Sequence, residues 1–298
     1  MKQIIIVVIF SLFLGCKSIT TVSHQDRNHF SRTGIEQFCI NGTVLVEGWG
    51  IDQKSHQEIS FLVPGEPYAA YLYWAGRNQT PLEDDFLYID GKQIKGELIY
   101  GEIPGNPPLE IQYIFTMRYD VSSFVKKGVN DFKVWGFDAF HNSGLGLVVL
   151  YQDNREIKNR IVLKNGLGFF WAGLEKEENK NSSLIEFKIE PDLKDRDVRV
   201  FMMFAGGAPS PRDEKIWFLT SDKKVEDAII SKGEVLFENQ IESKQGGEWD
   251  LIDFEVAVPE GAKYIYFQVE SPQDTSSPDH GDSLNFVLSG VELTLQDK

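Results

Sequence analysis

Acidic side chains gather in two loop-like stretches of the sequence, and oxygen-rich loops of this kind can hold calcium. These stretches are "EDD" at 83–85 and "DTSSPDHGD" at 274–282. Calcium takes carboxylate and carbonyl oxygens as ligands, and a glycine between Asp279 and Asp282 permits the tight turn that would bring them together. Neither stretch has EF-hand spacing, so a solvated acidic loop is the alternative. The sequence predicts Asp274, Asp279 and Asp282 as candidate calcium ligands.

Aromatic side chains are the second group with a potential for binding, because sugar rings stack on exposed Trp and Tyr. The stretch "YAAYLYWAG", residues 68–76, holds four aromatics, among them Trp74. Both of its faces are apolar, which favours a strand buried on both sides. In "KYIYFQVE", Tyr264 and Tyr266 alternate with apolar residues and make the better exposed pair. Tyr264, Tyr266 and Trp74 are the candidate glycan-facing aromatics, with core or cross-strand packing as the alternative for each.

The sequence contains no recognisable set of catalytic side chains. The five histidines are scattered, and no HExxH motif or histidine pair at ligand spacing occurs, which argues against a zinc enzyme. No nucleophile elbow or serine–histidine–aspartate order is present either. We therefore predict no catalytic residue and favour a protein that is not an enzyme.

The charge of the chain limits its partners. The formal net charge is −15 and the isoelectric point is about 4.8. A phosphate backbone would be repelled by this charge, and no basic cluster offsets it. The sequence therefore predicts no nucleic-acid partner, whereas a divalent cation or a neutral glycan remains compatible.

The N-terminal segment "MKQIIIVVIFSLFLGC" resembles a bacterial lipoprotein signal. Its apolar run, residues 4–14, is short for a membrane span and follows a positive charge. Gly15 stands at the small position before cleavage and Cys16 at the lipid-bearing position, although Phe13 replaces the usual Leu. The resemblance implies an extracytoplasmic protein with a lipid anchor on Cys16 in the cell envelope. Lys17, in place of Asp, favours the outer membrane. An ordinary secretory signal is the alternative.

The rest of the chain reads as strands separated by turns. Polar residues 17–34 predict a flexible tether, and clear period-two alternation, as in "LIEFKIE", predicts half-buried strands. We expect an all-β protein with two antiparallel β-sandwich, jelly-roll-like units at 35–174 and 182–298. The charged segment 175–181 is the predicted linker or long loop. Asp90-Gly91 predicts a hairpin, and residues 224–234 are the best candidate for a short helix.

Local patterns between residues 70 and 153 resemble a family of secreted bacterial surface domains of unknown function. In "YDVSSFV", Asp120 can cap a turn by accepting from the backbone of Ser122 or Ser123. The family shares this turn, a Leu-Tyr-Trp-Ala-Gly strand and a Leu-Val-Val-x-Tyr strand. Here Ser122 replaces the usual Thr, and Leu145 replaces a frequent Trp. The resemblance implies a jelly-roll-like β-sandwich and an extracytoplasmic location, and it supplies no catalytic residues.

These features leave three functional hypotheses. The first is an envelope-anchored lipoprotein that binds or scaffolds a glycan or an envelope protein without catalysis. The second is a carbohydrate-binding module, with calcium as a candidate cofactor. The third is a glycan-processing hydrolase, because paired jelly rolls occur in an amidase that removes N-linked glycans. This third hypothesis rests on analogy of fold, and the sequence alone does not select its paired carboxylates.

Overall fold

The protein is an all-β structure, as the sequence predicts. The computed structural model describes residues 4–7, 18–25, 29–51, 55–78, 85–103, 113–137, 142–154, 157–171, 180–206, 214–271 and 283–295. These residues form nineteen strands in three antiparallel sheets, and no α-helix occurs among them.

The strands divide into one large sheet and two small ones. The large sheet contains β1 (Ile4–Val7), β2 (Ser18–Gln25), β3 (His29–Gly50), β5 (Glu66–Asn78), β8 (Glu97–Glu102), β9 (Tyr113–Asp120), β11 (Asn142–Gln152), β12 (Lys158–Phe170), β14 (Arg196–Ala205), β17 (Trp249–Val258) and β19 (Leu284–Thr294). The first small sheet contains β4 (His56–Val63), β6 (Phe86–Ile89), β7 (Lys92–Lys95) and β10 (Gly128–Trp135). The second contains β13 (Ile185–Lys188), β15 (Lys215–Ser221), β16 (Glu234–Glu238) and β18 (Tyr264–Glu270).

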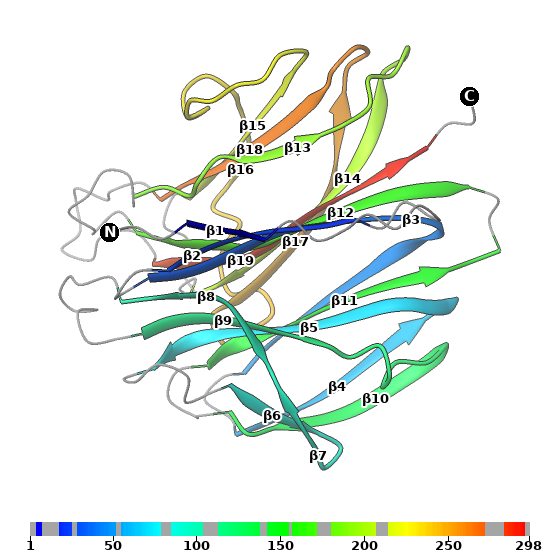
Figure 1. Ribbon diagram of the computed structural model, residues 1–298, viewed down its shortest axis with the longest axis vertical. Coiled ribbons are helices and arrows are strands. Elements are labelled where there is room, and N and C mark those ends of the chain that lie inside the picture. The colour runs from blue at the N-terminus through cyan, green and yellow to red at the C-terminus, as the bar shows by residue number, and fades with distance from the viewer. Residues whose placement is uncertain are drawn as a thin grey trace.

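The sheets stack in four layers (Figure 1). The large sheet folds over itself, so that its β11-β5-β9-β8 half faces its β3-β12-β19-β14-β17 half across an apolar core. The first small sheet covers the outer face of the first half, and the second small sheet covers the outer face of the other. The result is two β-sandwiches packed back to back, which confirms the predicted fold class.

Strand β5 shows how one sequence serves two cores. Leu72 and Trp74 point toward the first small sheet, whereas Tyr71 and Tyr73 point toward the other half of the large sheet. All four side chains are buried. A strand that is covered on both faces needs apolar residues on both, so its sequence shows no alternation. The prediction that "YAAYLYWAG" is mainly core is confirmed.

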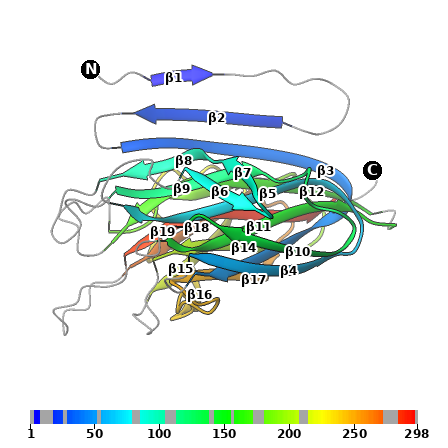
Figure 2. The same ribbon diagram turned by 90° about the horizontal axis from the view of Figure 1, so that it is seen from below.

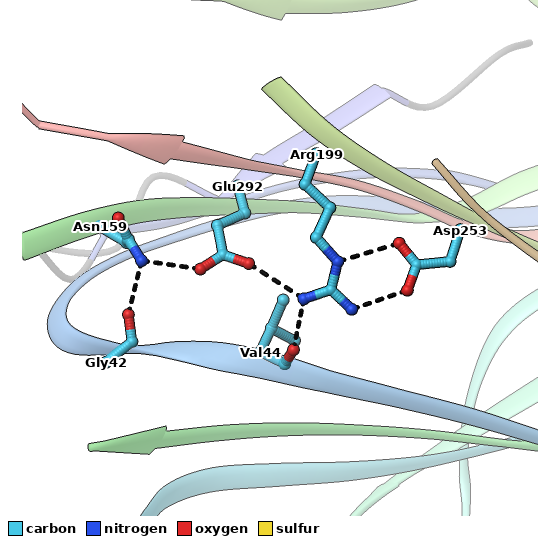
Figure 3. A network of polar contacts seen from close by, with 6 residues as sticks. All are labelled: Gly42, Val44, Asn159, Arg199, Asp253 and Glu292. Carbon is cyan, nitrogen blue, oxygen red and sulfur yellow. Dashed lines mark hydrogen bonds and ion pairs between the residues drawn. The ribbon is translucent and has the colours of Figure 1, made fainter. Parts of the chain in front are cut away.

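Strand β3 joins the two halves by changing partners near its middle. Residues 34–41 pair with β12, and residues 42–50 pair with β11 on the opposite edge. The carbonyls of Gly42 and Val44 therefore lie on the edge that β12 has left. The side chain of Asn159 donates to Gly42 at 2.7 Å and Arg199 donates to Val44 at 2.7 Å (Figure 3). These side chains supply the hydrogen bonds that a neighbouring strand would otherwise provide.

Acidic residues of the second sandwich hold both donors in place (Figure 3). Arg199 makes two hydrogen bonds to Asp253, of 2.9 and 2.7 Å, and one to Glu292 of 3.1 Å. Glu292 also accepts from Asn159 at 2.8 Å. The hydrogen bonds to Asp253 are the main reason why the pKa of Arg199 is raised, against the effect of burial. The guanidinium thus ties β14, β17 and β19 to the crossing point of β3.

Two of the predicted segment boundaries differ from the structure. Strand β12 falls in the predicted first unit, but it pairs with β19 and contributes Val162 and Phe170 to the second core. Residues 17–34 are not simply a tether, because β2 pairs with β3 from Ser18 onward and β3 begins at His29. Figure 2 shows β2 beside β3 at one edge of the molecule, with β1 outside it. The predicted linker 175–181 lies mostly outside the described residues.

Two turns form as the sequence predicts: the turn capped by Asp120 and the hairpin at Asp90-Gly91. The Asp120 carboxylate accepts from the Ser122 backbone at 2.9 Å, and Ser122 Oγ accepts from the Ala70 backbone at 2.9 Å. The hairpin between β6 and β7 turns at Asp90 and Gly91, both with positive φ angles of 49° and 87°. That geometry suits Asp-Gly in a two-residue turn. Both predictions are confirmed because each depends on contacts within a few residues.

Candidate functional site

A cavity of about 400 Å³ lies where the two halves of the large sheet meet beside β2. Seven strands line it, with Tyr71 on β5 and Asn165 on β12 contributing from opposite halves. Gly34 and Glu36 share one face of β3, and their partners across the β2 ladder are Thr21 and Ile19. The remaining lining residues are Arg32, Lys95, Glu97, Ile99, Arg118, Tyr119 and Asp120.

An ion pair between Arg118 and Glu36 forms the charged part of the cavity wall. Glu36 is 3% exposed, and its Oε1 accepts from the guanidinium of Arg118. The guanidinium carbon lies 3.8 Å from the centre of the Tyr71 ring, close enough for a cation–π contact. Burial lowers the pKa of Arg118, but the nearby Tyr73 and Glu36 outweigh this effect and the pKa is raised. The arginine is therefore a permanent cation.

A second polar pair lies opposite. The hydroxyl of Tyr73 donates to Oδ1 of Asn165 at 2.6 Å. Burial raises the pKa of Tyr73 and of Tyr71, so both phenols stay protonated at neutral pH. A Cβ at Gly34, which pairs with Asn165 on β12, would lie 3.5 Å from the amide nitrogen. The glycine therefore keeps the space beside the amide open.

Two buried polar atoms in this cavity have no hydrogen-bond partner among the described residues. They are Oε2 of Glu36 and Nδ2 of Asn165. Asn165 is only 1% exposed, so bulk water does not satisfy its amide. Buried polar groups in proteins are nearly always paired, and an unpaired one costs about 1–3 kcal/mol. Both residues line the cavity, so its wall holds one acceptor and one donor that the described protein groups do not satisfy.

The charges around the cavity are already compensated by the protein. Arg32 pairs with Glu97, and the Lys95 ammonium lies 3.2 Å from Asp85. Asp120 accepts a backbone N–H at 2.9 Å. The lining therefore holds three cations (Arg32, Lys95, Arg118) and three anions (Glu36, Glu97, Asp120). A neutral ligand matches this balance better than an ion does.

Hydroxyl groups meet these chemical requirements. A hydroxyl donates one hydrogen bond and accepts others, so hydroxyls can pair with an acceptor such as Glu36 Oε2 and with a donor such as Asn165 Nδ2. The exposed side chain of Ile19 adds an apolar surface to the lining. A small polyhydroxylated molecule combines hydroxyls with apolar C–H surfaces and suits this mixture of contacts.

The predicted glycan-facing aromatics are elsewhere and are covered. Trp74 and Tyr266 are both fully buried, so the expectation that they face a ligand is wrong. The hydroxyl of Tyr266 accepts from the Val225 backbone at 2.7 Å, and Gln268 accepts from Ile229 at 3.0 Å. The segment 222–233 covers the polar face of β18 in this way, and it forms turns rather than the predicted helix. Tyr264 is half-buried, and its ring centre lies 5.9 Å from that of Tyr266.

The other predicted site residues cannot be placed. Asp274, Asp279, Asp282 and Cys16 lie outside the described residues. Within the described part of the chain, no group of three or more His, Cys, Asp or Glu residues could hold a metal ion. The same residues include no helix that is long and apolar enough to cross a membrane.

Sequence reasoning missed Glu36, Arg118 and Asn165. One local signal was available for Glu36, because it is in phase with Phe38 and Ile40, which are buried on the same face of β3. A carboxylate at an inward-facing strand position is uncommon and needs a partner. Its partner, Arg118, is 82 residues away, and no local pattern connects the two.

Comparison with known proteins gives distant likenesses of fold only. No protein family matches this sequence, and no curated protein is similar to it in sequence. The solved structures that resemble it include PNGase F, a glycosylasparaginase from Flavobacterium meningosepticum. That match has 9% identity, a TM-score of 0.30, and covers 86% of this chain and 97% of the other.

Two further structures show how broad the likeness is. The ANX2 ectodomain from Arabidopsis thaliana has 8% identity and a TM-score of 0.29, over 94% of this chain and 89% of the other. BuGH86, solved with neoagarooctaose, has 10% identity and a TM-score of 0.24, over 94% of this chain and 34% of the other. Glycan-related proteins thus occur among the neighbours, but TM-scores this low carry no argument about function.

Proposed function

We propose that the chain is a lipid-anchored binding protein of the cell envelope, and that the cavity between its sandwiches binds a neutral saccharide. The observation that carries the ligand is the pair of unsatisfied polar atoms, Glu36 Oε2 and Asn165 Nδ2, in residues that line one cavity. The exposed side chain of Ile19 in the same lining supports it by offering an apolar contact for sugar C–H groups. The balanced charge of the lining supports a neutral ligand over an anionic one.

Replacing Glu36 by glutamine tests the ligand directly. Gln keeps an oxygen for Arg118 but turns the open acceptor into a donor, so the ligand loses one hydrogen bond to a charged group. Such a bond is worth about 1.5–3 kcal/mol, which predicts roughly a 10- to 100-fold loss of affinity. The measurement is calorimetric titration of neutral monosaccharides into the full chain in detergent.

Glu97→Gln is the matched control for this experiment. Glu97 also lines the cavity and pairs with an arginine, but its side chain is 49% exposed. We expect it to change the affinity by less than about threefold, because exposed ion pairs contribute little. Equal affinities of wild type and Glu36→Gln for a bound sugar would contradict the proposal.

The anchor follows from the lipoprotein-like signal and places the cavity near the membrane. Ile19 and Thr21 line the cavity three and five positions after Cys16. An extended chain covers at most about 3.6 Å per residue, so Thr21 lies within roughly 20 Å of the anchored sulfur. In this arrangement the saccharide site opens close to the bilayer rather than at the end of a long tether.

The chemistry of the cysteines makes the anchor testable. Cys16 would carry the lipid, and Cys39 is the only other cysteine of the sequence. A sulfur in a lipid thioether cannot also form a disulfide, so the two states exclude each other in one molecule. We expect protein purified from envelopes to carry the mass of a lipid on a chain that starts at Cys16, and Cys16→Ser to leave the membrane fraction. A non-lipidated chain with an internal disulfide would refute the anchor.

A further inference from the structure

Three aromatic side chains form a strip on the outer face of the first small sheet. We define the strip as Phe86 and Tyr88 on β6 and Trp135 on β10. Residues that alternate with them, such as Leu87 and Val134, are buried in the first core, so the three aromatics point outward. Phe86 is 39% exposed, and the other two are half-buried. No other layer of the protein covers this face (Figure 1) among the described residues.

Tyr88 and Trp135 stack on each other, and polar side chains lie at both ends of the pair. They are direct cross-strand partners, their ring centres are 5.6 Å apart, and their planes differ by 8°. The next partners outward in the same row are His56, opposite Trp135, and Gln93, opposite Tyr88. Both are exposed. A row of polar, aromatic, aromatic and polar side chains suits a sugar, whose C–H groups contact the rings while its hydroxyls bond at the rim.

The strip begins where the cavity wall ends. Lys95 lines the cavity and is the cross-strand partner of Phe86. Its ammonium lies 5.0 Å from the centre of the Phe86 ring and is held by Asp85 at 3.2 Å. Phe86 and Tyr88 are two residues apart on one face of β6, and Tyr88 contacts Trp135. The strip therefore extends from the edge of the cavity along one face of the sheet to Trp135.

We infer that the ligand is a linear neutral oligosaccharide, with one terminal unit in the cavity and the following units on the strip of Phe86, Tyr88 and Trp135. The inference rests on the proposed saccharide site. A two-residue step along β6 is about 7 Å and the step across to β10 is about 5 Å; since the two are perpendicular, Phe86 and Trp135 lie roughly 8 Å apart, which exceeds a single sugar ring. The cavity provides the hydrogen bonds, and the strip provides apolar contacts that increase with the length of the saccharide.

Matched sugars of different length test the inference. The probes are glucose with cellotetraose, N-acetylglucosamine with its β-1,4-linked tetramer, and mannose with β-1,4-mannotetraose. They are titrated into the full chain in detergent. We expect one tetramer to bind at least about tenfold more tightly than its monomer, because only the tetramer reaches the aromatic strip; tenfold corresponds to about 1.4 kcal/mol.

Variants of the strip and the cavity separate the two parts of the site. Trp135→Ala should bring the tetramer to the affinity of the monomer and leave the monomer unchanged, and Tyr88→Ala is the second variant with the same expectation. Glu36→Gln should weaken both sugars. The control is Trp217→Ala, at a half-buried tryptophan on the other outer sheet, which should change neither.

The outcomes distinguish a failure of the oligosaccharide inference from a failure of the proposed saccharide-binding function. The inference about the strip is refuted if monomer and tetramer bind with equal affinity. It is also refuted if Trp135→Ala and Tyr88→Ala do not change the affinity for the tetramer. In both cases the cavity remains as a monosaccharide site. If no probe of either length binds, the proposed function and the inference both fail.

Discussion

Replacing Arg118 by alanine is expected to destabilise the protein by about 3–5 kcal/mol, because removal of one partner leaves the other as an uncompensated buried charge. The remaining charge belongs to Glu36, which is 3% exposed and has only one other oxygen, already without a partner. The variant also loses the guanidinium that lies over Tyr71. Urea denaturation followed by fluorescence measures the free energy of unfolding.

A double variant shows whether the cost arises from the charge. Glu36→Gln with Arg118→Met removes both charges and fills the space, so it should recover most of the stability lost in Arg118→Ala. Arg77→Ala is a matched single variant, because Arg77 pairs with Glu248 at 3.1 Å but its side chain is 32% exposed. We expect it to cost about 1 kcal/mol or less. A similar cost for both arginines would show that the Glu36 site is more open than its burial indicates.

Replacing Trp249 by alanine is expected to cost about 3–5 kcal/mol, the usual range for a large aromatic removed from a core. Trp249 is fully buried between the two halves of the large sheet. Its side chain packs against Gly48 on β3 and against Gly144 and Gly146 on β11. A Cβ on Gly48, Gly144 or Gly146 would come within 2.9 Å of it. The sandwiches meet closely here because these residues lack side chains.

A double-variant cycle with Gly48 checks this packing. A Cβ on Gly48 would meet Nε1 of Trp249 at 2.9 Å and Cδ1 at 3.1 Å, so Gly48→Ala alone should destabilise the protein. In the Trp249→Ala background those atoms are gone, and the same change should cost less. Additive effects of the two substitutions in chemical denaturation would refute direct contact. Trp217→Ala on the outer surface should cost far less than Trp249→Ala.

Several elements of this protein are determined by neighbouring residues alone. Asp120 caps its turn because its carboxylate needs only a backbone N–H two residues ahead. Asp90-Gly91 forms the hairpin because both residues tolerate positive φ angles. The apolar residues on both faces of "YAAYLYWAG" required burial on both sides, and β5 lies between two cores. The all-β class follows from many local signals of this kind.

The alternation of a strand did not reveal what covers its polar face. Tyr266 and Gln268 stand opposite the core residues of β18, as the sequence predicts, but backbone N–H groups of 222–233 bond to both. Alternation shows only that the two faces of a strand differ in polarity. A face covered by polar backbone groups carries the same kinds of side chain as a face exposed to water, so the sequence does not distinguish the two. The assignment of β12 to the second sandwich was equally hidden, because strand pairing depends on partners more than a hundred residues away.

The candidate site is the part that only the tertiary structure decided. Glu36, Tyr73, Arg118 and Asn165 come from four strands, and each position alone is an ordinary strand residue. The folding of the large sheet over itself brings β3 and β12 against β5 and β9, and this leaves Glu36 Oε2 and Asn165 Nδ2 without partners in residues that line one cavity. The sequence by itself determined which residues form strands and turns, because those choices are local. The candidate site forms only when the sheets pack together. Its side chains are far apart in the sequence, and no spacing pattern connects them.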